Sequence, residues 1–282
     1  MNILTFDIEE WFHILDNNST KTYKEWQNYE SRIHRNMDRL FSILEKYDQK
    51  ATFFCLGWIA EHYPDTIRAI VERGHEIGSH TRMHQLIYEQ SSQSFKKDLE
   101  HSIKTLEDIT GQKVKYFRAP GFSIKEKNKW AIEIIAKAGI EADFSIFPAP
   151  RSHGGFPSYK SPAPSIISYK TIQLKELPIN YIKIMGKPLI FSGGGYFRLF
   201  PYSLIKQWTK QSDYVMTYLH PRDFDPNQPV IKDLPIHRKF KSYIGLKNSI
   251  TKLEKWLQDF DFIDAGTAIE KINWNDVPRV EI

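Results

Sequence analysis

Short apolar runs alternate with amphipathic stretches through the first half of the chain. The apolar runs predict buried strands at residues 2–7, 51–56, 75–80 and 114–118. Apolar positions at helical spacing predict helices at residues 26–47, 64–73, 94–109 and 125–138. Gly74 and Gly139 directly follow two of these helices, as is typical of helix ends. The alternation indicates βαβ units around a mainly parallel sheet, so the expected fold class is α/β.

The second half of the chain has a less regular pattern. Residues 149–164 are rich in Pro, Ser and Gly, which predicts a long loop. Further strands are expected at residues 166–179, 214–219 and 260–264, and further helices at 201–210 and 250–257. Since no repeat or charged linker divides the chain, we expect one domain over residues 1–282. Its candidate chemistry lies within about 1–225, and a C-terminal helix and closing strand occupy 226–282.

Two pairs of residues with metal-binding or acid–base chemistry follow predicted strands. Asp7 and Glu9 come at the end of the first strand, where side chains two residues apart point to the same side, whereas Glu10 would point away. His80 and His84 follow the third strand, and two histidines four residues apart can bind one metal ion. Each pair also has a plain structural explanation. Asp7 and Glu9 can be solvated acids at the end of a strand, and His80 and His84 can be two unrelated surface histidines.

Two single residues occupy similar positions. Arg118 follows the fourth strand, where a guanidinium can hold a carboxylate through two hydrogen bonds. His220 follows the strand at 214–219, and histidine is a ready general acid or base near neutral pH. Taken alone, the Arg118 motif can simply be part of a turn, and His220 can be a structural histidine. Because the C-terminal strand ends of an α/β barrel share one face, however, all of these side chains would converge there.

Composition and charge narrow the possible partners. The net charge of +5 is spread along the chain without long runs of one sign, so nucleic-acid binding is not expected. An anionic substrate or an anionic membrane surface is compatible with this mild excess. The aromatic content of 14% suits a carbohydrate site, although ring-rich cores are common. Oligomeric state is not predicted.

The location of the protein can also be predicted. The one cysteine, Cys55, lies in an apolar run, so it cannot form a disulfide within the chain and is expected to be buried. No segment approaches the length of about 18 apolar residues that a transmembrane helix needs. Because the candidate chemistry starts at Asp7, we expect no signal peptide before it. These points favour a cytoplasmic protein, with the inner membrane surface as an alternative place.

In their order along the chain, the motifs resemble the polysaccharide deacetylase (NodB-homology) family, carbohydrate esterase family 4. Thr5-Phe-Asp-Ile-Glu9 is similar to the family's Thr-Phe-Asp-Asp motif, and His80-Thr-Arg-Met-His84 to its His-Ser/Thr-x-x-His motif. Arg118-Ala-Pro120 resembles its Arg-x-Pro motif, Asp143-Phe-Ser-Ile146 its fourth motif, and Tyr218-Leu-His220 its last motif. One departure is that Ile8 stands where the family has a second Asp. The resemblance implies a distorted (β/α)7 barrel.

The resemblance is closer to an exopolysaccharide-type subgroup. Asp7-Ile-Glu-Glu-Trp-Phe12, the Gly-Gly-Gly-Tyr-Phe-Arg segment at 193–198 and Tyr218-Leu-His-Pro221 look like motifs of that subgroup. The glycine segment is either a loop beside the sugar site, with Arg198 binding an anionic group, or only a turn before the next helix. The residues expected to contact substrate are Pro120, Gly121, Tyr196 and Arg198.

The family resemblance also implies a metal and a mechanism. The expected metal is Zn²⁺, or Co²⁺ or Ni²⁺, held by Glu9, His80 and His84, although Glu10 or Asp7 remains a possible acidic ligand. Asp7 would be the general base and His220 the general acid. Arg118 would hold Asp7, and Asp143 would be the acid that tunes His220.

The expected function is removal of the N-acyl group from an amino sugar in a glycan, or in a lipid-linked or nucleotide-linked saccharide. One alternative is another C–N hydrolase of this fold, such as a deformylase or a ureide amidohydrolase, but those enzymes tend to lose part of the histidine pair. The other is a catalytically dead sugar-binding protein, in which the base or the late histidine is normally lost. Neither the sugar nor the acyl group can be predicted from these residues.

Overall fold

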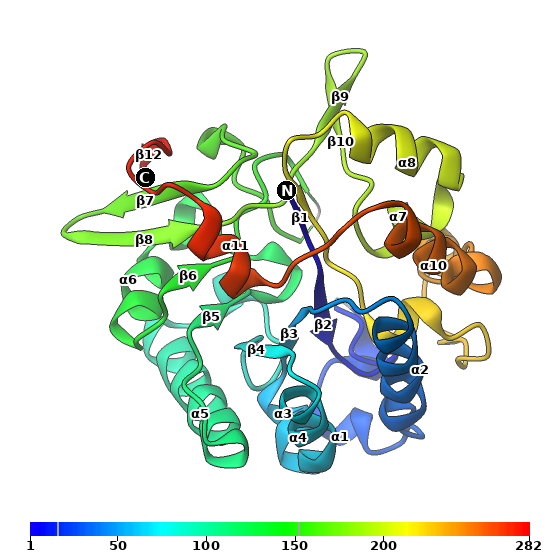
Figure 1. Cartoon of the computed structure of the whole chain (residues 1–282). Coiled ribbons are helices and arrows are strands. Elements are labelled where there is room, and N and C mark those ends of the chain that lie inside the picture. Colours follow the sequence, from blue (N-terminus) through cyan, green and yellow to red (C-terminus); the bar gives the residue numbers. More distant parts are fainter. Residues whose placement is uncertain (16, 152) are drawn as a thin grey trace.

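Parallel strands form the centre of the molecule, and β1 and β2 run through the middle of them (Figure 1). The structure is a computed structural model that describes residues 1–15, 17–151 and 153–282. Its strands are β1 (Asn2–Ile3), β2 (Thr5–Ile8), β3 (Thr52–Cys55), β4 (Glu76–Ser79), β5 (Tyr116–Phe117), β6 (Ala142–Asp143), β7 (Ser165–Tyr169), β8 (Ile172–Glu176), β9 (Ile182–Ile184), β10 (Lys187–Leu189), β11 (Val215–Met216) and β12 (Arg279–Glu281). The strand predicted at 2–7 is thus present as β1 and β2, and those predicted at 51–56, 75–80 and 114–118 are present but shortened by one or two residues at each end.

The strands form an open, distorted barrel. Parallel pairing runs from β2 through β3, β4, β5 and β6 to β8. On the other side of β2, Phe6 bridges to Leu219, and β1 pairs with β11. The series of neighbouring strands therefore has seven positions, with β11 at one end, β8 at the other, and β1 and β2 sharing one position. Among the described residues, no ladder joins β8 to β11, which leaves the barrel open there. The α/β barrel class predicted from the sequence is confirmed.

Two hairpins and a late strand extend this barrel. β7 and β8 pair antiparallel, and β12 adds to the outer side of β7. The hairpin of β9 and β10 projects away from the strands at the top of Figure 1. The strand predicted at 260–264 is reduced to a bridge between Ile263 and Ile3, and the strand at β12 was not predicted. Phe262 of this segment is buried in the core, although the segment forms no ladder.

Helices cover the outside of the barrel strands (Figure 1). They are α1 (Tyr23–Trp26), α2 (Ile33–Lys46), α3 (Gly57–His62), α4 (Pro64–Glu72), α5 (Ser92–Thr110), α6 (Trp130–Lys137), α7 (Gly194–Leu199), α8 (Tyr202–Lys210), α9 (Ile236–Tyr243), α10 (Ser249–Asp259) and α11 (Ala265–Lys271). Residues 26–47, predicted as one helix, divide into the end of α1 and α2. The reason is that the Glu10 carboxylate accepts hydrogen bonds from the backbone N–H groups of Arg32 and Ile33, which starts α2 there.

The alternation of side chains along the strands divides the core into two parts. Leu4, Phe6 and Ile8 pack in the larger cluster, which includes the apolar faces of the helices. Ile3 belongs to a second cluster with Phe54, which is formed by strand residues of the opposite orientation. Thr5 and Asp7 share the orientation of Ile3, so β2 directs its polar side chains away from the helices. None of the described helices has both the length and the apolar character needed to cross a membrane.

Candidate metal centre and active site

One carboxylate oxygen, Oε1 of Glu9, lies beside two imidazoles. Its distance is 3.1 Å to Nε2 of His80 and 2.9 Å to Nε2 of His84, and all three side chains are buried. The Arg118 carbonyl accepts a hydrogen bond of 2.7 Å from Nδ1 of His80, which fixes this ring with Nε2 toward Glu9. His84 reaches the same point from a tight turn, with φ 53°. One carboxylate oxygen and two imidazole nitrogens are the ligand set of many catalytic zinc sites.

The electrostatics of Glu9 suit a cation. Burial raises the pKa of Glu9, but the nearby His84, His220 and His80 outweigh burial and hold this pKa well below its usual value. The ligand atoms of Glu9, His80 and His84 all lie within 4.8 Å of one another. A divalent ion placed among them would therefore meet an ionised carboxylate and two correctly oriented ring nitrogens.

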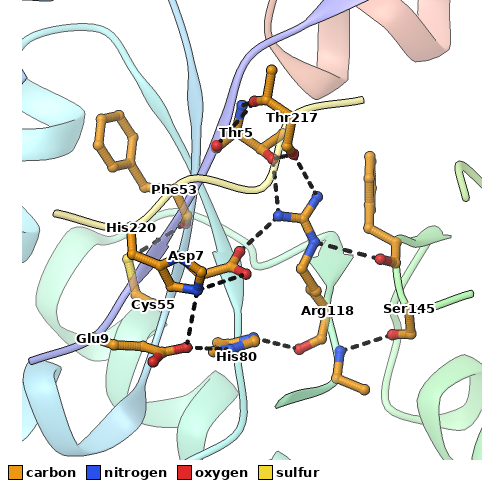
Figure 2. Close-up of polar contacts among 12 residues, drawn as sticks. Thr5, Asp7, Glu9, Phe53, Cys55, His80, Arg118, Ser145, Thr217 and His220 are labelled. Carbon is orange, nitrogen blue, oxygen red and sulfur yellow. Dashed lines mark hydrogen bonds and ion pairs between the residues drawn. The ribbon is translucent and has the colours of Figure 1, made fainter. Parts of the chain in front are cut away.

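Asp7 and Arg118 form a buried ion pair beside this centre (Figure 2). Nη1 of Arg118 donates to Oδ1 of Asp7 at 2.6 Å and to Oγ1 of Thr5 at 2.9 Å. Nη2 donates to the Thr217 carbonyl at 3.4 Å, and the guanidinium carbon lies 4.2 Å from the ring centre of Phe54. Because the guanidinium is held on several sides, it fixes Asp7 Oδ1 and leaves Oδ2 toward His220 (Figure 2).

His220 completes the cluster from the opposite side of β2. Its Nε2 lies 3.8 Å from Oδ2 of Asp7 and 3.8 Å from Oε1 of Glu9. Its Nδ1 lies 3.1 Å from Oδ2 of Asp223, whose other oxygen accepts from Nε of Arg198 at 2.9 Å. Burial lowers the pKa of His220, but Glu9, Asp223 and Asp7 together raise it to about 9. The ring is thus oriented by Asp223 and can carry a proton on Nε2.

Family models match the chain in two consecutive regions. Residues 4–142, which contain Asp7, Glu9, His80, His84 and Arg118, match the model described as polysaccharide deacetylase. Residues 4–142 belong to the polysaccharide deacetylase family. Residues 144–270 match a domain of unknown function, DUF3473. His220 and Asp223 therefore come from the second region, outside the polysaccharide deacetylase match.

Several named relatives are similar to parts of this chain. Identity is 30% over 96 residues to a peptidoglycan-N-acetylglucosamine deacetylase of Bacillus cereus, covering 34% of this chain and 35% of the relative. The identity is 38% over 79 residues to chitin deacetylase 1 of Saccharomyces cerevisiae, covering 28% of this chain and 26% of that protein. A peptidoglycan deacetylase of Helicobacter pylori is 23% identical over 197 residues, covering 63% and 64%. In each case the chain spans less than two thirds of the relative's length.

Solved structures show the same fold. A polysaccharide deacetylase structure from Mycobacterium smegmatis aligns with a TM-score of 0.67 and 18% identity, covering 99% of this chain and 92% of that one. A carbohydrate esterase family 4 pseudoenzyme from Bacillus anthracis aligns with a TM-score of 0.50 and 14% identity, covering 99% and 66%. At these identities the likeness concerns the barrel alone, and it includes a protein described as inactive.

Asp143 lies away from the position expected for it. Among the described residues, the carboxylate in contact with Nδ1 of His220 is Asp223, three residues along the chain, and not Asp143. Asp143 is fully buried at the end of β6, where it accepts a hydrogen bond from Ser145. Burial raises the pKa of Asp143 to about 6, and burial together with Asp143 raises the pKa of Glu176 well above its usual value. Asp143 and Glu176 thus form a buried acid pair, in which burial favours the protonated form of Glu176.

Glu10 and Glu9 have separate roles, as the strand alternation predicts. Glu10 Oε1 accepts from Ser31 and from the first backbone N–H groups of α2, so it caps a helix and points away from the histidines. Of the residues that follow β2, Glu9 is therefore the carboxylate placed for metal binding. Asp7 lies close enough to Glu9 and His220 to belong to a second group of possible ligands.

The residues expected to contact substrate lie in different places. Gly121 lines the pocket described below, while Pro120 is buried beside it. Arg198 is buried and donates to Asp223 and to the carbonyls of Ile244 and Lys241, so its side chain orients Asp223 and is not open to a substrate anion. Tyr196 is 42% exposed on α7 and stacks on Phe200. The glycine segment is the start of α7, which favours its structural interpretation.

A pocket of about 190 Å³ opens beside the metal centre. Asp7, Glu9, His80, His84 and His220 form part of its wall. Sequence analysis missed several other residues that line it, which are His13, Arg151, His153, Arg222 and Arg238. Arg222 and Asp223 directly follow the Leu-His-Pro motif, and this position is the signal that could have identified them. Arg151 and His153 lie in the predicted loop at 149–164, where no pattern distinguishes them.

Proposed function

We propose that the protein is a metal-dependent hydrolase that removes an N-acyl group, such as acetyl, from an amino sugar. The observation that carries the proposal is the meeting of Nε2 of His80 and Nε2 of His84 at one oxygen of Glu9, in the wall of a pocket. Membership of the polysaccharide deacetylase family supports the reaction class. The relatives named as deacetylases of peptidoglycan and chitin support an N-acetylated sugar as substrate.

Glu9, His80 and His84 would hold the divalent ion, for which Zn²⁺ is our first choice and Co²⁺ or Ni²⁺ the alternatives. When bound, such an ion supplies a Lewis acid for the acyl oxygen and lowers the pKa of water, the nucleophile of amide hydrolysis. The hydrogen bond from His80 to the Arg118 carbonyl keeps its ligand nitrogen aimed at this point. The structure of the chain thus presents the ligands before any substrate arrives.

Asp7 and His220 would transfer the protons of the reaction. Oδ2 of Asp7 is not bonded to Arg118 and would accept the proton of the attacking water, while Arg118 holds the other carboxylate oxygen in place. As the bond between the acyl carbon and the nitrogen breaks, Nε2 of His220 would donate a proton to the leaving amine. Asp223 orients His220 for this step, since it binds the opposite ring nitrogen. The products are a carboxylic acid and the free amino sugar.

The carrier of the sugar, whether a glycan, a lipid or a nucleotide, is not specified by the metal centre. The cytoplasmic location and the exopolysaccharide-type subgroup expected from the sequence also stay predictions. Two alternatives remain distinguishable by experiment. A deformylase or ureide amidohydrolase would act on other C–N bonds, and a dead sugar-binding protein would bind amino sugars without releasing acid.

The test is release of acetate from N-acetylglucosamine oligosaccharides by the purified chain. We expect activity that is lost with a chelator and restored by Zn²⁺, and a His84→Gln variant that loses both bound metal and activity. His101→Gln is the matched control, since His101 has a half-exposed side chain that pairs with Glu61 outside the pocket. Full activity in the metal-free protein, or sugar binding without any release of acid by the zinc-loaded protein, would contradict the proposal.

A further inference from the structure

Among the described residues, the pocket beside the proposed metal centre has more positive than negative side chains. The acids among these residues are Asp7 and Glu9, which already have partners in Arg118 and the two metal-site histidines. The same pocket is lined by Arg151 and Arg222, and by Arg238, which has partners of its own. Bound metal would add further positive charge. A pocket with this balance favours a ligand that is anionic over one that is neutral.

Arg222 is held next to the proton-donating histidine. It belongs to the short 3-10 helix Pro221–Phe224 that directly follows His220, and its guanidinium carbon lies 5.9 Å from the ring centre of Tyr243. Nη2 of Arg222 is buried and has no hydrogen-bond partner in the part of the chain that the structure describes. Burial and the nearby Arg198 lower the pKa of Arg222 more than Tyr243, Asp223 and Glu9 raise it. A buried unpaired N–H is costly, and an anionic oxygen in the pocket would remove that cost.

Arg151 comes from the loop on the other side of the pocket and is held by aromatic rings. Its guanidinium carbon lies 4.9 Å from the ring centre of Phe147, 5.1 Å from that of Phe122 and 5.4 Å from that of Tyr218. Such stacking fixes the plane of the guanidinium. The Tyr218 side chain also forms a hydrogen bond with Arg151, so only part of the guanidinium is left for a ligand. Nη1 of Arg151 is likewise buried without a hydrogen-bond partner among the described residues.

We propose that Arg151 and Arg222 form an anion subsite, so that the substrate is an N-acyl amino sugar that also carries a phosphate or carboxylate group. This inference rests on the proposed function, because it places the anionic group in the same pocket as the N-acyl group. A planar guanidinium binds the paired oxygens of a phosphate or a carboxylate through parallel hydrogen bonds, so both sources share the required chemistry. Arg238 adds charge at this pocket but donates to the Leu15 carbonyl, and it is not needed for the subsite.

The experiment compares three substrates with the zinc-loaded chain: N-acetylglucosamine, its 1-phosphate and its 6-carboxylate analogue. We expect kcat/KM for at least one anionic sugar to exceed that for the neutral sugar by about tenfold or more. Arg222→Gln and Arg151→Gln should each lower kcat/KM for the anionic sugar by about ten- to a hundredfold, mainly through KM. Their kcat/KM for the neutral sugar should fall by a smaller factor, because that sugar has no anionic group to pair with the arginine. The anionic sugar with the higher kcat/KM shows whether the subsite binds a phosphate or a carboxylate group.

Matched variants separate the subsite from general charge and from misfolding. Arg68→Gln removes the same charge from an exposed position on α4 outside the pocket and should change none of these values. Arg222→Lys keeps the charge without the planar fork and should recover part of the lost affinity. Thermal melting of each variant checks its fold, and Arg151→Gln provides the test if Arg222→Gln does not fold.

The outcomes distinguish this inference from the proposed function. Equal kcat/KM for neutral and anionic sugars, unchanged in both arginine variants, would overturn the subsite and leave the deacetylase proposal intact. If no sugar is hydrolysed, the proposed function fails, and calorimetry with N-acetylglucosamine 1-phosphate then tests the subsite by itself. Binding that weakens at least tenfold in both arginine variants but not in Arg68→Gln would support it. Equal binding in all variants would overturn it.

Discussion

Asp7 and Glu9 lie two residues apart on one side of the same strand end, yet they have different partners. Glu9 contacts the two imidazoles and Asp7 contacts Arg118, so one oxygen is placed for a metal and another for a proton. Ile8 between them is fully buried in the core. Alternation along an extended chain therefore accounts for the absence of an acid at position 8: an aspartate there would point into apolar packing.

Replacement of Asp7 by Asn separates these two roles. Asn cannot accept the proton of water, so we expect kcat to fall by about 10²–10⁴-fold. Bound zinc should stay at the wild-type stoichiometry, because Glu9, His80 and His84 are unchanged. Steady-state kinetics and metal analysis of the same preparation provide the measurement, with the melting temperature recorded because Arg118 loses its ion pair. Loss of the metal in Asp7→Asn would show instead that Asp7 is a ligand.

The sequence placed several site residues correctly relative to one another but not all of them. Asp7, Glu9, His80, Arg118 and His220 were expected to converge because each follows a strand of one parallel sheet, and the structure brings them together. The orienting acid could not be identified in this way. Asp143 also follows a strand, but its strand ends beside a different carboxylate, Glu176. The carboxylate that contacts Nδ1 of His220 comes instead from the turn after the strand, where Asp223 lies.

At the scale of elements, the three glycines at 193–195 allow close contact between α7 and the strand before His220. A Cβ on Gly193 would lie 2.4 Å from the carbonyl oxygen of Tyr218, with which Gly193 forms a bridge. Gly194 has φ +51°, and a Cβ on Gly195 would lie 2.9 Å from the carbonyl oxygen of Lys241. Packing at Gly193 and Gly195, and the backbone conformation at Gly194, thus explain why these positions are glycine, and neither explanation involves substrate.

A Gly193→Ala substitution tests this packing. The added methyl group must displace the Tyr218 backbone and therefore His220, so we expect kcat to fall at least tenfold while bound zinc is retained. Gly111→Ala is the matched control: Gly111 ends α5 with φ +69° and open space around it, so alanine there brings only backbone strain of about 1 kcal/mol. Wild-type kcat in Gly193→Ala would contradict the proposed link between this segment and His220.

Element boundaries were less predictable than element order. The helix predicted from residue 26 begins instead at Ile33, because the Glu10 carboxylate from a distant segment supplies the cap. The strand predicted at 260–264 lacks a continuous partner, and β12 was missed because its pairing depends on where β7 is placed by the fold. The periodicity of apolar residues predicts which side chains are buried. Helix caps and strand partners depend on residues distant in the sequence, so periodicity does not predict them.

At the scale of the whole molecule, His75 makes the stability of the fold depend on pH. His75 is buried with its ring near Phe41 and Phe53, and burial, then Lys50 and Arg73, lower its pKa to about 4. The unfolded chain takes up this proton near pH ~6.5, before the folded protein does. The free energy of unfolding is therefore highest above this pH and decreases as the pH falls toward 4.

His75→Gln should remove this contribution. Between pH 7.5 and pH 5, the wild type is expected to lose up to about 2 kcal/mol more stability than the variant. Urea unfolding followed by circular dichroism at both pH values measures the difference, and the values at pH 7.5 correct for any change in packing. Parallel losses in the two proteins would show that other groups govern the acid sensitivity.

The contact between Phe6 and Leu219, and the hydrogen bond from the Thr5 backbone to Thr217, join the polysaccharide deacetylase region to the region that follows it. A gene fragment that stopped at residue 142 would encode the ligand trio without His220, and it would leave β2 as an uncovered sheet edge prone to aggregation. Because each region supplies the neighbour of a strand in the other, we expect that neither would keep a stable set of strands when expressed alone.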